Sequence, residues 1–255
     1  MSEHIQTSKD GAVLTIRFNR PDKKNAFTVA MYEAMAAALA DAERDAAVRV
    51  VLFTAAGDAF TAGNDLGDFM SKPPTDENSP VFRFLAALAS ASKPLVAAVD
   101  GLGVGIGLTL LLHCDLVYAS ERTRLRAPFV DLGLVPEAAS SLILPGLMGH
   151  QRAAEILLLG ETIDAKRAHE LGLVNAVVPS AELAGRVADA CQKLAAKPPM
   201  ALKLTKQLLK DPGHRTVHER IRHEAVFFGK QLVSAEVKEA ITAFFEKRAP
   251  DFSKL

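Results

Sequence analysis

The sequence lacks tryptophan, has only two cysteines and carries no excess charge of either sign. Cys114 and Cys191 are too few for a disulfide framework or a cysteine-based metal site, so we expect buried thiols, a reducing compartment and no bound metal. The 30 basic and 30 acidic residues cancel, whereas a nucleic-acid binder usually has a basic excess. The most apolar stretch, residues 94–112, contains Asp100 and several glycines, which does not suit a membrane span. Composition thus argues against nucleic-acid and membrane partners.

What the sequence does contain is enough apolar material for a large α/β core. Its 255 residues, 49% of them hydrophobic, suit one large domain or a core with a smaller appendage. Hydrophobic patterns predict strands at residues 12–18, 48–54, 95–99 and 116–119. Helical spacing predicts helices at residues 28–44, 108–113, 136–144, 151–159, 164–170 and 181–196. We therefore predict a layered α/β core over residues 1–197.

The last part of the chain has a different pattern. The composition changes near Lys197-Pro198-Pro199, and residues 201 to about 248 are almost purely helical in pattern, with charged faces. We predict a helical C-terminal region over residues 198–255 that packs on the core or on a neighbouring subunit.

Two loops after predicted strands are suited to exposing backbone N–H groups. In Ala59–Leu66 (AFTAGNDL), Gly63 permits a turn that aims the N–H of Asn64 outward, and Asp65 is placed to cap a following helix. In Val99–Gly107 (VDGLGVGIG), glycines alternate before a helix start, which favours an anion site. The spacing does not match the dinucleotide-binding fingerprint Gly-x-Gly-x-x-Gly, and no phosphate-loop lysine follows. We expect two N–H donors that converge on one oxyanion.

A third stretch, Asn19–Phe27 (NRPDKKNAF), also follows a predicted strand. Pro21-Asp22 is typical turn chemistry, and Lys23 and Lys24 offer charge for a phosphate group. Taken together, in this order and spacing, NRPDKKNAF, AFTAGNDL and VDGLGVGIGLTLLLHCDLVYAS resemble the crotonase (enoyl-CoA hydratase/isomerase) superfamily over nearly the whole chain.

This resemblance implies a fold, a substrate class and an assembly. The fold would be a spiral of ββα units, with the helical C-terminal region mediating formation of a homotrimer or of a hexamer made of two trimers. The substrate would be an acyl-CoA thioester, so that coenzyme A is part of the substrate and no further cofactor is expected. The oxyanion hole would be the N–H groups of Asn64 and Ile106. The resemblance places coenzyme A or the acyl group beside Lys24, Ala26, Ala62, Asp65, Leu66, Gly105, Phe129, Phe245 and Lys247.

The same resemblance narrows the reaction. Family hydratases use two glutamates, and here their positions hold Thr109 and Phe129, which argues against hydration because water activation and carbon protonation both need an acid/base. A different carboxyl group, Glu137, follows Pro136 in the first turn of a predicted helix. The run PEAASSLILPGLMG resembles the peroxisomal-type Δ3,Δ2-enoyl-CoA isomerases, in which this glutamate is the acid/base. Other crotonase reactions (hydration, thioester hydrolysis) and a non-catalytic acyl-CoA-binding paralogue stay as alternatives.

Further residues have simpler interpretations. We expect Phe129, Leu134 and Leu110 to surround Glu137 with apolar groups that raise its pKa. Asp68 and Asp131 are the alternative acid/base candidates. We expect His113 to pack in the core and Asp115 to be a buried, hydrogen-bonded carboxylate. The histidines of the tail are expected on a solvated or subunit-contacting face: His214, His218 and His223. The polar N-terminal residues lack a signal-peptide core, so we expect a cytoplasmic protein, or a peroxisomal one in a eukaryote because the chain ends in Ser253-Lys254-Leu255.

Overall fold

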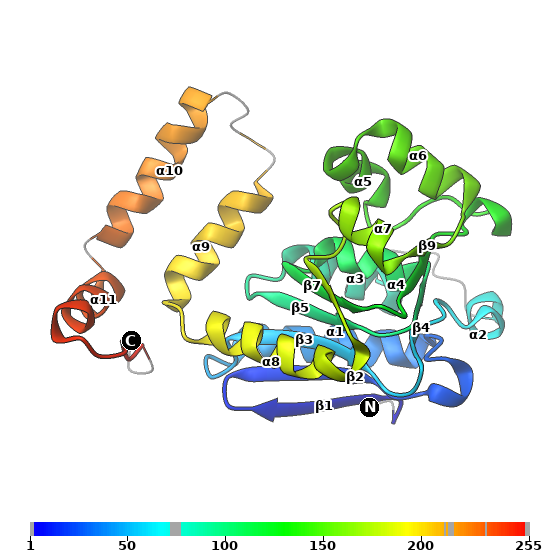
Figure 1. Ribbon diagram of the computed structural model, residues 1–255, viewed down its shortest axis with the longest axis horizontal. Coiled ribbons are helices and arrows are strands. Elements are labelled where there is room, and N and C mark those ends of the chain that lie inside the picture. The colour runs from blue at the N-terminus through cyan, green and yellow to red at the C-terminus, as the bar shows by residue number, and fades with distance from the viewer. Residues whose placement is uncertain (1–2, 72–77, 212, 214–216, 233, 253–255) are drawn as a thin grey trace.

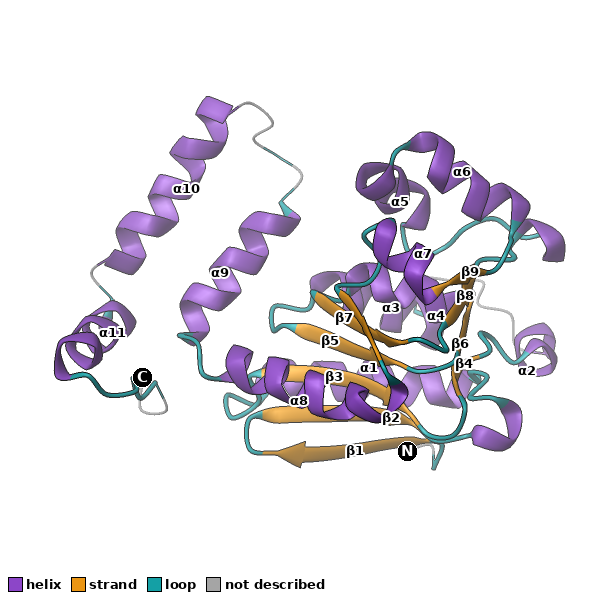
Figure 2. Cartoon of the chain, viewed as in Figure 1, coloured by secondary structure: helices purple, strands orange, loops and turns teal. Residues whose placement is uncertain are grey.

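The computed structural model describes residues 3–71, 78–211, 213, 217–232 and 234–252. Two sheets with helices on their faces form the body, and a helical tail extends from it (Figures 1 and 2). The first sheet has the order β1-β2-β3-β5-β7-β10. Its strands are β1 (Ile5–Asp10), β2 (Val13–Phe18), β3 (Val50–Ala55), β5 (Leu95–Val99), β7 (Leu116–Ser120) and β10 (Ala176–Val178).

The second sheet is smaller and has the order β4-β6-β8-β9. Its strands are β4 (Ala59–Thr61), β6 (Leu102–Val104), β8 (Arg124–Arg126) and β9 (Ile163–Asp164). Each of β3, β5 and β7 in the first sheet is followed by a strand of the second sheet and then by helices. The predicted α/β spiral of ββα units is therefore confirmed.

Helices cover both faces of the first sheet. On one face, α8 (Ser180–Ala195) packs over a small apolar cluster that includes Val50, Val96 and Tyr118. On the other face, α1 (Val29–Arg44) and α3 (Pro80–Ser90) enclose the main core, where alternate strand residues such as Phe53 point. This division follows from the two-residue side-chain period of a strand. The remaining helices of the body are α2 (Leu66–Ser71), α4 (Ile106–Thr109), α5 (Ser140–Met148), α6 (His150–Leu159) and α7 (Ala165–Glu170), with short 3-10 helices η1 (Pro21–Lys23), η2 (Leu110–His113) and η3 (Val130–Leu132).

Three sequence-based expectations need correction. Residues 5–10 form strand β1, which pairs antiparallel with β2. The sequence did not indicate this edge strand, because only Ile5 of it is buried and its apolar and polar residues therefore hardly alternate. The glycine loop contains strand β6. The helix expected to begin at Pro136 begins at Ser140 instead, because Ala138 and Ala139 both adopt left-handed backbone conformations (φ 51° and 55°). Glu137 therefore lies in a loop before the helix and not in its first turn.

The predicted helical tail consists of α9 (Pro199–Lys210), α10 (Val217–Leu232) and α11 (Ala235–Glu246), and it projects away from the two sheets (Figure 1). Lys206, 5% exposed, joins α9 to the body: its Nζ donates to the Lys93 carbonyl and to Asp115 Oδ2, both at 2.7 Å. Asp115 also accepts from the backbone N–H of Leu95 at 2.7 Å. It is therefore hydrogen-bonded as expected, although it is only partly buried.

Among the described residues, no helix combines the length and the apolar character that crossing a membrane requires. The Ser253-Lys254-Leu255 end and His214 lie outside the described residues. Cys191 is buried and Cys114 is of intermediate exposure. Burial raises the pKa of both thiols, that of Cys191 to about 11, so neither has the character of a reactive thiolate.

Candidate active site

The two predicted N–H donors lie at the same edge of the second sheet. β4 and β6 are parallel neighbours, and Thr61 is paired with Gly103. Asn64 lies three residues beyond Thr61, and Ile106 lies three residues beyond Gly103. Because parallel strands end at one edge of their sheet, the chain leaves both strands side by side there. The topology thus brings together the two residues that the resemblance names as the oxyanion hole.

The backbone around each residue orients its N–H group. Phe27 donates to the Gly63 carbonyl at 2.7 Å and accepts from the Asp65 N–H at 2.8 Å, so Asn64 between them faces its own N–H away from Phe27. Gly105 has φ +56° and ψ −115°, a conformation that favours glycine, and Ile106 begins α4. Within the described residues, neither the Asn64 N–H nor the Ile106 N–H donates to a protein group. Both are available to a ligand oxygen.

Two glycines allow the loops to approach this closely. A Cβ added to Gly63 would lie 2.9 Å from the Val104 carbonyl oxygen, and one added to Gly107 would lie 2.6 Å from the Thr61 methyl group. These distances are shorter than carbon contacts permit, so any side chain at either position would push the two loops apart. The spacing of the N–H donors therefore depends on glycine at both places.

Glu137 enters the site from the loop before α5. Its carboxyl Oε1 accepts a hydrogen bond from the Thr109 hydroxyl, at the end of the helix that Ile106 begins. Although the residue keeps some exposure, burial of its carboxyl group raises its pKa to about 7, against the lowering effect of the Thr109 hydrogen bond. A carboxyl group with a pKa near neutrality can take up and release a proton at physiological pH.

Backbone contacts hold the Glu137 loop in place. The Glu137 carbonyl accepts from the Ser140 N–H at 3.0 Å and from the Ser140 hydroxyl at 2.6 Å. The Ala138 carbonyl lies 2.9 Å from His113 Nε2. His113 is buried as predicted, at 7% exposure, and burial lowers its pKa. These contacts sustain the left-handed backbone of Ala138 and Ala139, a costly conformation that is typical of functional sites.

Tyr32 holds the Asn64 side chain, and sequence reasoning missed it. Its hydroxyl donates to Asn64 Oδ1 at 2.5 Å, and its ring packs edge-on against Phe27 and Phe84 at centroid distances of 5.5 and 5.6 Å. Burial and then the charge of Glu137 raise the Tyr32 pKa well above its usual value, so the hydroxyl stays protonated. The available signal was a tyrosine on the apolar face of the 28–44 helix, since a buried hydroxyl needs a partner.

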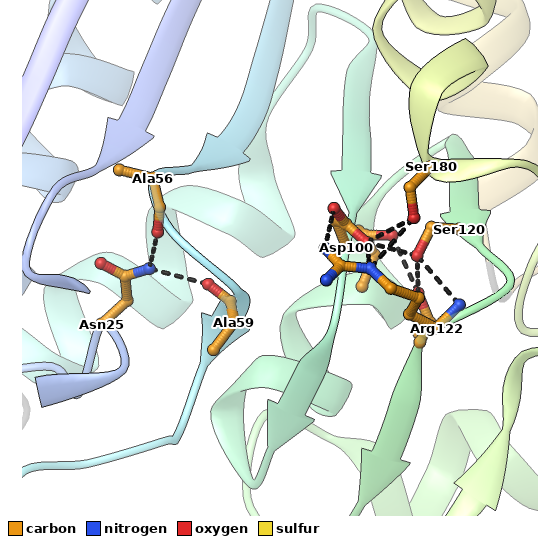
Figure 3. Close-up of polar contacts among 9 residues, drawn as sticks. Asn25, Ala56, Ala59, Asp100, Ser120, Arg122 and Ser180 are labelled. Carbon is orange, nitrogen blue, oxygen red and sulfur yellow. Dashed lines mark hydrogen bonds and ion pairs between the residues drawn. The ribbon is translucent and has the colours of Figure 1, made fainter.

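The residues expected to line the coenzyme A path partly gather around the same loops. Lys24 is exposed, and its carbonyl accepts from the Ala62 N–H at 2.9 Å. Asn25, fully buried, fixes this turn: its Nδ2 donates to the carbonyls of Ala56 and Ala59, both at 2.7 Å (Figure 3). Ala26 and Ala62 are half-buried. Asn25 is therefore the anchor of the lysine-bearing turn, a role that the sequence alone did not reveal.

The Asp65 side chain is hydrogen-bonded to neighbouring protein groups. It accepts from Arg20 Nη1 at 2.7 Å and from the Asp68 N–H at 3.2 Å, which confirms the predicted helix cap, and these bonds lower its pKa. Leu66 follows it with 56% exposure. Asp65 is thus held as a carboxylate that supports the loop.

The remaining predicted site residues divide into two groups. Phe129 and Leu110 are buried, whereas Leu134 is 43% exposed and does not belong to a closed apolar surround. Phe245, 77% exposed, and Lys247 lie at and just after the end of α11, and this helix lies at the opposite end of the molecule from α2 and β4 (Figure 1). Within one chain, the structure does not bring Phe245 or Lys247 to the site.

The competing candidates are engaged elsewhere. Asp68 accepts from the Val29 N–H at 2.6 Å, and Asp131 pairs with Arg126 at 2.8 Å. In the tail, His218 is exposed and His223 lies 3.2 Å from an Asp211 oxygen. No group of three or more His, Cys, Asp or Glu side chains suited to a metal ion occurs within the described part of the chain.

Comparison with known proteins gives the family. The family model for enoyl-CoA hydratase/isomerase matches residues 8–254. Enoyl-CoA delta isomerase 2 of Rattus norvegicus is 36% identical over 253 residues, which are 97% of this chain and 64% of that protein. The 1,2-epoxyphenylacetyl-CoA isomerase of Escherichia coli K12 is 34% identical over 99% of both chains. A solved structure from Magnetospirillum magneticum AMB-1 has a TM-score of 0.96 at 47% identity, covering 99% of this chain and 100% of that one.

These matches span the whole chain in sequence and in fold. The chain spans slightly less than two thirds of the rat relative's length and nearly all of the bacterial one's. With its ββα spiral and paired N–H donors, the chain belongs to the enoyl-CoA hydratase/isomerase (crotonase) family of acyl-CoA enzymes.

Proposed function

We propose that the protein is a Δ3,Δ2-enoyl-CoA isomerase, which moves the double bond of a 3-enoyl-CoA to the trans-2 position. The observation that carries the proposal is Glu137, a carboxyl group with a pKa of about 7 that is hydrogen-bonded to the helix carrying one of the two proposed oxyanion donors. Thr109 connects it to the helix that Ile106 begins, and its charge acts on Tyr32, whose hydroxyl donates to Asn64. The rat relative, which is named an isomerase, supports the same reaction.

The proposed reaction uses one proton carrier. Ionised Glu137 removes a proton from C2, and the electron pair moves onto the thioester oxygen to give a dienolate. The N–H groups of Asn64 and Ile106 hold that oxygen; losing one such donor typically raises the barrier by about 2.7–4 kcal/mol. Protonated Glu137 then returns the proton to C4, the C2–C3 double bond forms and the carbonyl is restored, so no proton is gained or lost.

The residues at two positions weigh against hydration. The resemblance to family hydratases places their glutamates at Thr109 and Phe129, and neither side chain has a titratable group at neutral pH. Addition of water needs a base for the water and an acid for the carbon, whereas a double-bond shift needs one group that serves C2 and C4 in turn. Glu137 alone supplies the second requirement.

We also propose that the chain works as a homotrimer or as a hexamer of two trimers, with coenzyme A entering as part of the substrate. The tail supports this assembly because several large apolar side chains there are exposed: Val217, Phe228, Leu232, Phe244 and Phe245. Faces of this kind usually mark protein contacts. In such an assembly, Phe245 and Lys247 of one subunit would be free to approach the site of another.

The test is an assay of the purified chain with trans-3-hexenoyl-CoA and trans-2-hexenoyl-CoA in parallel. We expect conversion of the 3-enoyl thioester and no hydration of the 2-enoyl thioester. Hydration of the latter would overturn the proposal in favour of a hydratase, and release of free coenzyme A would point to a thioester hydrolase. Binding with neither turnover nor exchange of the C2 proton into D₂O would point to a non-catalytic acyl-CoA-binding protein.

A further inference from the structure

We infer that Thr109 is a positioning residue: its hydroxyl holds one carboxyl oxygen of Glu137, so that the other oxygen carries the proton between C2 and C4. The inference rests on the proposed isomerase function. It gives a role to Thr109, which occupies a position where the family hydratases have a glutamate.

The geometry leaves the Thr109 hydroxyl one good acceptor. Thr109 is fully buried, and its backbone N–H donates to the Gly105 carbonyl at 3.0 Å. Its Oγ1 donates to Glu137 Oε1, while the alternative acceptor, the Gly105 carbonyl, is 3.4 Å away. Because a threonine side chain has few rotamers, the rigid turn of α4 fixes where the hydroxyl points. The hydrogen bond therefore fixes the position of the carboxyl group relative to α4. This helix begins at Ile106, whose N–H group is one of the two proposed oxyanion donors.

A hydrogen bond to one oxygen makes the two carboxyl oxygens unequal. The oxygen that accepts from Thr109 already has a proton donor, so its remaining basicity is reduced, and the other oxygen is the better base. The Ser140 contacts to the Glu137 carbonyl fix the opposite end of the residue. With both ends held, the side chain has little freedom to exchange its two oxygens, and a single oxygen serves both proton transfers.

The hydrogen bond also opposes the effect of burial. Burial alone favours the protonated acid, and a donor to the ionised form favours the base. The titratable side chains facing this region in the described residues are Tyr32 from α1 and His113 from η2, which contacts the next residue's carbonyl. The Tyr32 pKa is raised and the His113 pKa is lowered, so both are neutral near pH 8. Glu137 is then the group that titrates near neutrality.

The experiment compares Thr109→Val, which keeps the shape and removes the hydroxyl, with Thr109→Ser, which keeps the hydroxyl. Thr123→Val is the matched control, because Thr123 is also fully buried and donates to a backbone carbonyl, that of Val99, at 2.9 Å. For each full-length variant, kcat and KM for trans-3-hexenoyl-CoA are measured from pH 5 to 9. The pKa of Glu137 is read from ¹³C-carboxyl-labelled glutamate by NMR, its signal being the one absent in Glu137→Gln.

We expect Thr109→Val to lower kcat about 10- to 100-fold with little change in KM, a loss of the size expected when a hydrogen bond to a charged group is removed. The acid limb of its pH profile and the NMR pKa of Glu137 should both move upward. Thr109→Ser should restore both, and Thr123→Val should change neither.

An unchanged Glu137 pKa in Thr109→Val, or a serine variant that behaves like the valine one, would overturn the role of Thr109. The NMR measurement needs no turnover. If the pKa moves as expected while the wild-type chain leaves 3-enoyl-CoA unchanged, the isomerase proposal and the proton-carrying role fail, and only the hydrogen bond's effect on the carboxyl group survives.

Discussion

Two carboxyl groups of this protein, Glu137 and Asp100, lie in turns next to the sheets but in opposite environments. Asp100 follows β5 and is surrounded by donors: Ser120 Oγ at 2.5 Å, Arg122 Nη2 at 2.5 Å and Ser180 Oγ at 3.3 Å (Figure 3). Glu137 has one hydroxyl donor and no cationic partner in the described residues. Burial acts to raise both pKa values, but the Arg122 and Ser120 contacts lower that of Asp100 while Glu137 reaches about 7.

The difference shows what separates a structural carboxylate from a reactive one. Asp100 is paired and hydrogen-bonded, so its charge is stabilised and its proton is gone throughout the physiological range. The Glu137 carboxyl is held by position but left short of donors, which costs stability and makes its proton available for transfer. Residue type does not distinguish the two, because each is a carboxyl group in a turn that is followed by a small residue, Gly101 or Ala138.

The largest expected effect is on activity. Glu137→Gln should lower isomerase turnover about 10²–10⁴-fold, the usual contribution of a general acid/base, whereas Asp100→Asn should leave kcat nearly unchanged. The check is steady-state kinetics together with exchange of the C2 proton into D₂O. Asp131→Asn is a further control, since Asp131 was an alternative acid/base and pairs with Arg126. Full turnover in Glu137→Gln would remove this residue from the chemistry.

The free energy of unfolding should change in opposite directions in Asp100→Asn and Glu137→Gln. Asp100→Asn loses an ion pair and charged hydrogen bonds at a partly exposed site, and we expect about 1–2 kcal/mol of destabilisation at pH 8. Glu137→Gln removes a carboxylate that the fold disfavours, and we expect about 1–3 kcal/mol of stabilisation at that pH. Urea unfolding followed by circular dichroism measures both. Destabilisation of similar size in the two variants would mean that their environments do not differ in this way.

The smallest and most discriminating effect is the pH dependence of these stability differences. The Glu137 pKa is raised on folding, so its contribution is fully present below about pH 4.5 and is lost as pH rises to about 7. The gain in Glu137→Gln should grow across that window and then level off. The Asp100 pKa is lowered on folding, so the loss in Asp100→Asn should be greatest at neutral pH and shrink as pH falls below about 4. Parallel slopes for the two variants would contradict the comparison.

Local patterns indicated the two glycine loops because backbone geometry there depends on glycine. Gly63 and Gly107 are required by contacts too short for any side chain, and Gly105 by a positive φ, so their spacing carries information even without a fold. The apolar strands and the amphipathic helices were likewise visible as periodic patterns. The edge strand β1 was not, because a strand with one buried residue has almost no periodic signal.

The proposed acid/base role of Glu137 rests on resemblance, and the structure altered the setting expected for this residue. A proline followed by glutamate predicted a helix start at Pro136. Instead, Ala138 and Ala139 adopt left-handed backbone conformations, and the helix begins at Ser140. Propensity disfavours such a backbone; a tertiary contact from His113 and a local one from Ser140 hold it. The Ser140 contact is local, three residues along the chain, whereas His113 lies 25 residues from Ala138 and reaches its carbonyl only when the chain folds.

The sequence by itself indicated an α/β core and two glycine loops, because glycine spacing and hydrophobic periodicity are local properties. Its motifs also carried the resemblance that implied the family, the ββα framework and the two N–H donors. Only the tertiary structure decided what the carboxyl groups do. The Thr109 hydroxyl lies 28 residues from Glu137 in the chain, and Tyr32 lies 32 residues from Asn64. A pKa depends on which donors, charges and apolar groups surround a carboxyl in space, and that neighbourhood is formed only when distant segments pack together.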